Sequence, residues 1–332
     1  MSTFLIPLLV IAGAVVVLLE SGKRVVRSIT VLARSFKLSE YVLAYVLLAF
    51  ASSLPEFSVG ISAALSDVPE LSFGDILGTN IINVTLVMGV VAIVGGTVSL
   101  RDYSHFQQNR LYQLIIVLAP MIMLLDGTLS RLDGVILLLL GVWSVFRLLD
   151  IDDRILGRKV LRPHLSPAVE KVVVTRRQVW WYAGMFIAST LALLAATYLI
   201  VESAKTLAEA LHVSTFLIGV LVVATCTSLP ELTIGVRSVL QNKGGIALGD
   251  IFGAAMISSC FTLGIVALIS PIVLADTQVV WIGIIFTLGT FLAVYYFLHT
   301  KHSLSRTEGY VLVGGFVLFI VTQIVSVTGW FG

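Results

Sequence analysis

Two short motifs concentrate the residues of this 332-residue chain that could do chemistry. One reads SSLPE and ends at Glu56; the other reads TSLPE and ends at Glu231, 175 positions later. Both lie inside long apolar runs, where a charged group is costly unless it is paired or bound to a cation. The two glutamates are therefore candidate ion ligands. The alternative is a pair of protonated acids that are hydrogen-bonded inside a helical bundle.

Each glutamate follows a proline, Pro55 or Pro230. Because proline has no N–H and clashes with the preceding turn, we expect it to interrupt the helix and to release backbone carbonyls near 49–52 and 224–227. Hydroxyl groups stand at the same places, on Ser52, Ser53, Thr227 and Ser228. Carboxylates, carbonyls and hydroxyls are hard oxygen donors, which suit Ca²⁺, Mg²⁺, Mn²⁺ or Na⁺. For any single hydroxyl, a bond back to its own helix is the alternative.

A second segment in the first half is expected to pack against these motifs. It reads GDILGTNIIN at 74–83, and its Gly74 and Gly78 permit a close helix contact or a second helix break. Thr79 and Asn83 lie one helical turn apart and so share a face. The sequence therefore predicts that both side chains point into the same cavity.

The matching segment of the second half reads GDIFGAAMIS at 249–258. It has Ala254 and Ser258 at the positions of the threonine and the asparagine. Asp75 and Asp250 lie near the starts of these segments. We interpret them as helix N-terminal caps, and the alternative is that they attract cations at a vestibule.

The composition indicates what kind of protein must hold these segments. Hydrophobic residues make up 58% of the chain and charged residues only 12%, about half the charged share of a soluble domain. The chain is therefore expected to be an integral membrane protein, and continuous apolar runs predict helices rather than barrel strands. At about 20 residues a span, ten segments qualify. They are 3–30, 39–66, 71–96, 111–127, 132–150, 179–204, 214–240, 246–271, 277–298 and 308–327.

The two halves of the chain are related in sequence. The offset of 175 between the glutamate motifs also links FGDILG at 73–78 to LGDIFG at 248–253. Five helices in each half is an odd number, so the second half must enter the membrane from the opposite side. The sequence thus predicts an all-α membrane protein of ten transmembrane helices in two inverted five-helix repeats, a layout of many secondary transporters. The predicted divisions are a first repeat at 1–150, a linker at 151–178 and a second repeat at 179–332.

Basic residues predict the orientation in the membrane. With the N-terminus outside, all but two of the 21 lysines and arginines fall on the cytoplasmic side; the exceptions are Arg131 and Lys205. We therefore expect a multi-pass protein of the plasma (inner) membrane with both termini outside and the central linker in the cytoplasm. The lipid bilayer is the expected partner, nucleic acid is not, and the oligomeric state is left open.

The pairing of SSLPE with GDILGTNIIN, and of TSLPE with GDIFGAAMIS, resembles the repeats of the calcium/cation antiporter superfamily, which includes the sodium/calcium and proton/calcium exchangers. The resemblance is to the prokaryotic type and covers the whole chain. It implies a central site in which Glu56 and Glu231 bind Ca²⁺, and a first helix in each half that slides against the core to alternate access. For Ca²⁺ it also implies the backbone oxygens of Ser52 and Thr227, and for flanking monovalent sites it implies Ser53, Ser228, Thr79 and the carbonyls of Ala49 and Ala224. Asn83 matches a family asparagine beside the glutamates, and Ser258, at a family aspartate position, is counted among the predicted site residues.

Two positions depart from the prokaryotic sodium/calcium exchangers. Those proteins usually carry a serine where this chain has Ala254 and an aspartate where it has Ser258. One sodium ligand and one carboxylate are therefore missing. The proton/calcium exchangers manage with two glutamates, although their GN-x-x-E motif is absent here. We expect exchange of Ca²⁺ for H⁺, in which protons on Glu56 and Glu231 replace one Ca²⁺, and Na⁺ coupling is the alternative.

Other function classes are less favoured. An antiporter of Mg²⁺ or Mn²⁺ and a cation channel are two alternatives, and an intramembrane enzyme is a third. The glycine–aspartate pairs are typical of membrane aspartyl proteases, but the glycine expected three residues before each aspartate is Ser72 or Ala247. The cysteines, Cys226 and Cys260, provide neither a disulfide framework nor zinc spacing. We expect no enzymatic activity and no cofactor, only transported ions.

Overall fold

The computed structural model describes residues 2–35, 53–99, 104–155, 176–241, 244–274, 277–301 and 303–327. Helices dominate it, and the strands among these residues are two or three residues long. Seven helical stretches of the described residues are long and apolar enough to cross a membrane, and two shorter apolar helices accompany them. The chain is thus an all-α membrane protein, and the count of ten spans stays a prediction.

The helices coincide with the predicted segments wherever these are described. The first half has α1 (Ser2–Ser35), α3 (Leu54–Leu65), α4 (Pro69–Ile82), the π-helix η1 (Asn83–Val87), α5 (Met88–Gly95), α6 (Ser104–Met123), the 3-10 turn η2 (Leu124–Asp126) and α7 (Arg131–Ile155). The second half has α9 (Arg176–Leu211), α10 (Thr215–Ile218), the π-helix η3 (Gly219–Val223), α11 (Ala224–Thr227), α12 (Leu229–Leu240), α13 (Gly244–Ile257), the π-helix η4 (Ser258–Thr262), α14 (Leu263–Ile269), α15 (Thr277–Lys301) and α16 (Arg306–Val327). Residues 39–52 of the second predicted span and 156–175 of the predicted linker lie outside the described residues.

The bounds of the elements repeat at the offset found in the sequence. The helices α3, α4 and η1 begin and end 175 residues before α12, α13 and η4. Two small antiparallel sheets then join one half to the other. Strand β1 (Thr97–Ser99) pairs with β4 (Ser303–Ser305), and β2 (Thr128–Leu129) pairs with β3 (Ile272–Val273). These elements of the two halves therefore match in length and spacing, and two strand pairs connect the halves.

Glycine contacts between helices follow the same repeat. A Cβ added at Gly134 of α7 would lie 2.7 Å from the carbonyl oxygen of Gly264 in α14. Its counterpart at Gly309 of α16 would lie 2.8 Å from the carbonyl oxygen of Gly89 in α5. Only glycine permits such a close backbone approach. Each half thus packs its last helix against a core helix of the other half through a matched glycine pair.

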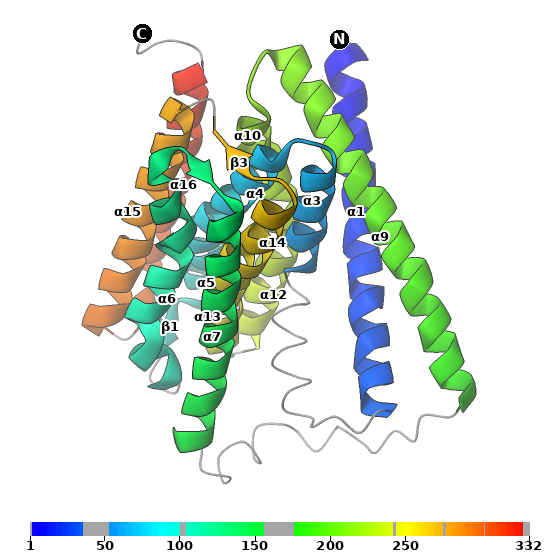
Figure 1. The fold of residues 1–332 in the computed structure, drawn as a ribbon. Helices are drawn as coiled ribbons and strands as arrows, with labels where there is room; N and C mark the ends of the chain where they lie inside the picture. The colour runs from blue at the N-terminus through cyan, green and yellow to red at the C-terminus, as the bar shows by residue number, and fades with distance from the viewer. Residues whose placement is uncertain are drawn as a thin grey trace.

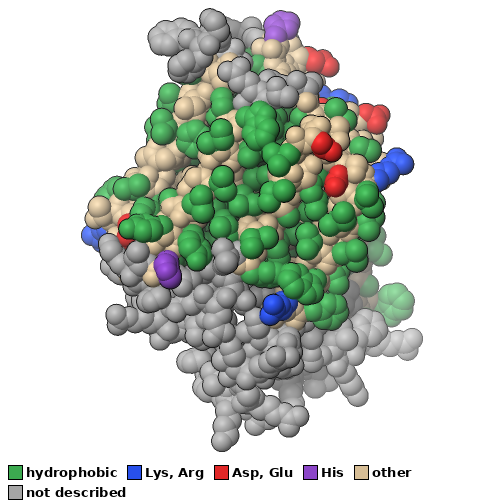
Figure 2. Space-filling model, turned by 60° about the vertical axis from the view of Figure 1, so that its left-hand side comes forward, with side chains coloured by type: hydrophobic (Ala, Val, Ile, Leu, Met, Phe, Trp, Pro, Cys, Tyr) green, Lys and Arg blue, Asp and Glu red, His purple; other side chains and the backbone are tan. Residues whose placement is uncertain are grey.

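Figure 1 shows α1 and α9 as a long helix pair along one side of the bundle. The start of α1 and the end of α16 lie at one end of the molecule, whereas α7 ends and α9 begins at the other (Figure 1). The surface in Figure 2 is largely hydrophobic, with few charged side chains. Large apolar side chains such as Trp180, Trp181 and Phe146 are more than half exposed, as expected for a surface that faces lipid.

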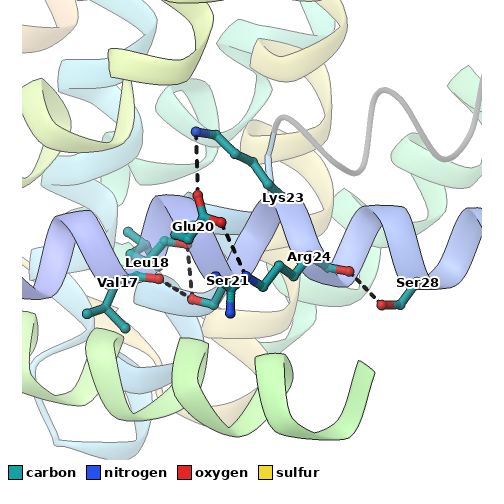
Figure 3. Close-up of polar contacts among 7 residues, drawn as sticks. All are labelled: Val17, Leu18, Glu20, Ser21, Lys23, Arg24 and Ser28. Carbon is teal, nitrogen blue, oxygen red and sulfur yellow. Dashed lines mark hydrogen bonds and ion pairs between the residues drawn. The ribbon is translucent and has the colours of Figure 1, made fainter. Parts of the chain in front are cut away.

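The two long helices, α1 and α9, differ in the partners of their lysine side chains. On α1, Glu20 pairs with Lys23 at 3.9 Å and with Arg24 at 3.2 Å, so these contacts stay within one helix (Figure 3). On α9, Lys205 pairs with the preceding glutamate and also donates to the carbonyl oxygen of Ser66, at 3.2 Å. Because Ser66 is the C-terminal cap of α3, this bond fastens α9 to the core.

Candidate cation site

Both candidate glutamates lie in the first turn of a helix. Helix α11 ends at Thr227, and α12 begins at Leu229 with Pro230 and Glu231 in its first turn. Helix α3 begins in the same way, with Pro55 and then Glu56. The predicted helix boundary at each proline is confirmed. A carboxylate at this position is stabilised by the unsatisfied N–H groups and the dipole of the helix N-terminus.

The glutamate side chains are removed from solvent, with 1% of Glu56 and 0% of Glu231 exposed. Within the described residues, none of their four carboxyl oxygens has a hydrogen-bond partner. Glu56 interacts electrostatically with Glu231, and Asp75 and Asp250 act on both. No lysine, arginine or histidine is buried in the described part of the chain. Like charges in such surroundings are unfavourable unless cations or protons neutralise them.

The segments that pack against these glutamates contain π-helical turns. Asn83 begins η1 and Ser258 begins η4, and both residues are buried. Neither polar atom of the Asn83 side chain has a partner among the described residues. A third turn, η3, directly precedes Ala224. Such turns rearrange the backbone hydrogen bonds and are frequent at functional sites. No proline or glycine begins η1 or η4, and Gly219 at the start of η3 does not by itself predict a π-helical turn.

Thr79 and Thr227 meet across the two halves of the chain. Their hydroxyl oxygens lie 3.1 Å apart. The Thr227 hydroxyl donates to Asp75 Oδ1 at 2.9 Å, and Thr79 lies 3.5 Å from the same oxygen. The interpretation of Asp75 as a helix cap is wrong, because α4 begins at Pro69 and Asp75 lies fully buried in its middle.

The interpretation of Asp250 as a cap is wrong for the same reason, since α13 begins at Gly244. Asp250 is only partly buried, unlike Asp75. The possible second helix break at Gly78 is also absent, because α4 continues to Ile82. The glycine instead makes the close contact that was the other expectation: a Cβ there would lie 2.5 Å from the carbonyl oxygen of Val220.

The remaining predicted ligands divide into described and undescribed residues. Ser53 and Ser228 are buried, and their hydroxyls have no partner among the described residues. The Ala224 carbonyl accepts the Ser228 N–H at 3.1 Å, so it retains one lone pair for a cation. Ser52 and Ala49 lie outside the described residues.

One further polar contact crosses between the halves. The amide of Asn80 donates to the Ser259 hydroxyl at 3.2 Å, and both residues are fully buried. Histidine, cysteine, aspartate and glutamate side chains do not gather in threes as a metal cluster in the described part of the chain. Hydroxyl, amide and carbonyl oxygens would therefore have to complete a cation site around the glutamates. Such an all-oxygen set suits a hard cation.

Known proteins resemble this chain over most of its length. The family model described as "Sodium/calcium exchanger protein" matches residues 6–149 and 181–325. The inner membrane protein YrbG of Escherichia coli is 31% identical over 79% of this chain and 79% of its own. The sodium/calcium exchanger MaX1 of Methanosarcina acetivorans is 24% identical over 94% of this chain and 97% of its own.

Solved structures resemble the fold as well. One is the sodium-calcium exchanger NCX_Mj soaked with sodium and strontium, and the match covers 95% of this chain and 98% of the exchanger chain. Its TM-score is 0.60 at 24% identity. A second structure of the same exchanger has a TM-score of 0.58 at 25% identity, over 96% of this chain and 97% of its own. The whole chain therefore shares the fold of an exchanger.

Proposed function

Because the chain belongs to the sodium/calcium exchanger protein family, we propose that it exchanges Ca²⁺ for monovalent cations across its membrane by alternating access. Members of this family are transporters rather than enzymes, and they move Ca²⁺ and Na⁺ without a cofactor. The protein is an integral, multi-pass membrane protein. We further propose that its ten spans form two inverted repeats, with both termini outside and the linker in the cytoplasm.

The observation that carries the proposal is the burial of Glu56 and Glu231 without hydrogen-bond partners among the described residues. Two carboxylates in a low-dielectric interior carry a charge that one Ca²⁺ would neutralise. Two protons would neutralise it equally well. An empty, doubly charged site is costly to carry across the membrane. Crossing without a ligand is then disfavoured, and the result is exchange rather than leak.

For the coupling ion we propose H⁺ first. Ala254 and Ser258 leave the second half without the serine and the aspartate expected of a sodium/calcium exchanger. Fewer polar groups then flank the two glutamates on that side. Na⁺ is the second candidate, and the hydroxyl pair of Thr79 and Thr227 beside the buried Asp75 favours it. An exchanger of Mg²⁺ or Mn²⁺ would use the same oxygen donors.

For alternating access we propose that α1 and α9 slide against the core as the resemblance implies. They lie together along one side of the bundle (Figure 1). Sliding of α9 would break the bond from Lys205 to the Ser66 carbonyl, whereas the Lys23–Glu20 pair lies within α1 and would persist. A cation channel is the rival function, and it would need no such sliding pair.

The test is Ca²⁺ flux into proteoliposomes that contain the purified protein, with pH and sodium gradients imposed separately. Uptake that saturates and follows the pH gradient at zero sodium supports proton coupling. Uptake driven by a sodium gradient at fixed, matched pH overturns it in favour of sodium. Electrogenic flux that does not saturate would instead indicate a channel. Parallel runs with Mg²⁺ and Mn²⁺ identify the divalent ion.

A further inference from the structure

Asp75 is a buried charge to which the proposed exchange has so far given no role. It lies in the middle of α4 with 0% of its surface exposed. One carboxyl oxygen, Oδ1, faces the hydroxyls of Thr79 and Thr227, and the other, Oδ2, has no partner among the described residues. A carboxyl group buried at this depth is costly, and by default it indicates a functional site.

The contact between Asp75 and Thr227 decides which way the Thr227 hydroxyl points. A hydroxyl has one proton to donate. Threonine in a helix usually donates it to a carbonyl one turn earlier, and here the carbonyls of Val223 and Ala224 lie 3.3 Å away. Asp75 Oδ1 is nearer, at 2.9 Å, and a carboxylate is the stronger acceptor. The Thr227 hydroxyl therefore donates its hydrogen bond to Asp75.

Because the Thr227 hydroxyl donates to Asp75, the carbonyl oxygens of Val223 and Ala224 do not accept its hydrogen bond. The Ala224 carbonyl is a predicted cation ligand and keeps a lone pair for that purpose. Thr79 becomes the donor in its 3.1 Å contact with Thr227, which leaves both lone pairs of the Thr79 oxygen available. Asp75 thus fixes two hydroxyls of the predicted site in a cation-accepting orientation.

The backbone is built so that this contact can form. Carbon atoms added at Gly74 would collide with the carbonyl of Phe216, and at Gly78 with that of Val220. Helix α4 and the segment α10–η3–α11 therefore touch along their backbones. This contact holds Asp75 against Thr227, only four residues before Glu231. An exchange of ligand at Glu231 is thereby tied to the first half of the chain.

The repeat mate of Asp75 differs from it in burial. Asp250 is only partly buried, whereas Asp75 is fully buried. The second half also lacks the carboxylate that the family resemblance expects at Ser258. The buried carboxylates of the site are therefore Glu56, Glu231 and Asp75.

We propose that Asp75 is a positioning residue of the divalent-cation site, which acts through the Thr227 hydroxyl to hold the oxygen atoms of Thr227, Thr79 and Ala224 toward the bound ion. This inference rests on the proposed function and adds to it a residue outside the two glutamate motifs. Asp75 itself need not touch the ion.

The test compares the KM and the maximal rate of Ca²⁺ uptake in proteoliposomes for variants of this pair. Asp75→Asn should raise the KM about tenfold and leave the maximal rate within about twofold, because the amide keeps the shape but is a weaker acceptor for the hydroxyl. Thr227→Val should raise the KM similarly. Thr227→Ser keeps the hydroxyl and should have a KM close to that of the wild-type protein. A merely structural role would change the melting temperature and the maximal rate instead.

A double-mutant cycle completes the test. If Asp75 acts through the hydroxyl, the variant with both Asp75→Asn and Thr227→Val should have the KM of Thr227→Val alone. Effects that multiply, or an unchanged KM in Asp75→Asn, would overturn the inference. If Asp75→Asn does not fold, equal KM values in Thr227→Val and Thr227→Ser would overturn it alone. A wild-type protein that takes up no divalent ion would refute the proposed function first, which distinguishes the two failures.

Discussion

The contact between α4 and the second half provides a sharp prediction at Gly78. A Cβ added there would lie 2.5 Å from the carbonyl oxygen of Val220 and 2.7 Å from the Cβ of Ala224. Both neighbours are at or near the backbone and cannot swing aside. Overpacking of this kind costs about 1–3 kcal/mol. In Gly78→Ala the higher helix propensity of alanine offsets about 1 kcal/mol of that cost.

An exposed glycine of another helix provides a control for this substitution. Gly314 of α16 is exposed, and a Cβ there meets nothing within 4 Å among the described residues. Gly314→Ala should therefore gain the propensity of about 1 kcal/mol without a collision. The propensity cancels between the two variants, so their free energies of unfolding should differ by the contact cost alone, about 1–3 kcal/mol.

The assay is thermal unfolding of both purified variants in the same detergent, followed by Ca²⁺ uptake. Gly78→Ala should melt several degrees below Gly314→Ala. It should also take up Ca²⁺ more slowly, because separating α4 from α11 pulls Thr79 and Asp75 away from Thr227. Equal melting temperatures for the two variants would refute the close backbone contact.

Three further predictions concern the glutamates, the coupling ion and the α9 contact. Glu56→Gln or Glu231→Gln should abolish divalent exchange in vesicles while leaving a folded protein, because one neutralising charge is lost; normal transport by either would contradict the central-site assignment. Ser258→Asp should change the dependence of Ca²⁺ uptake on monovalent ions, and an unchanged dependence would mean that this position does not select the coupling ion. Lys205→Met removes the bond to a carbonyl at the end of α3 and should cost about 0.5–1.5 kcal/mol in thermal unfolding. Lys23→Met, on a side chain that is 75% exposed, should cost almost nothing, and equal losses in the two variants would argue against the α9 contact.

Local chemistry made part of the site predictable from the sequence. The helix boundaries at Pro55 and Pro230 follow from a missing N–H and a steric clash, which any proline carries with it. The depth of Glu56 and Glu231 follows from the apolar runs around them. Thr79 was expected to face the cavity because of its helical spacing, and it contacts Thr227 from the other half. These inferences needed only the order of residues along the chain.

The interpretation of Asp75 failed because helix bounds were read from the hydropathy of the segment. Hydropathy places the start of this segment at about residue 71, four residues before Asp75. Helix α4 begins at Pro69, so Asp75 lies well inside it. More importantly, no pattern near an aspartate says which hydroxyl from a distant segment will meet it. The π-helical turns at Asn83 and Ser258 were missed for a related reason, since no glycine or proline marks them.

The sequence by itself determined that the protein lies in a membrane, that it is helical and repeated, and that two acids lie beside broken helices. Hydropathy, proline geometry and the fixed offset are properties of the chain, so folding does not alter them. Only the tertiary structure decided that Thr227 donates to Asp75, 152 residues away, and that Gly78 lies against the carbonyl of Val220 from the other half. Those facts depend on which helix surfaces meet, and two segments of related sequence can meet different neighbours.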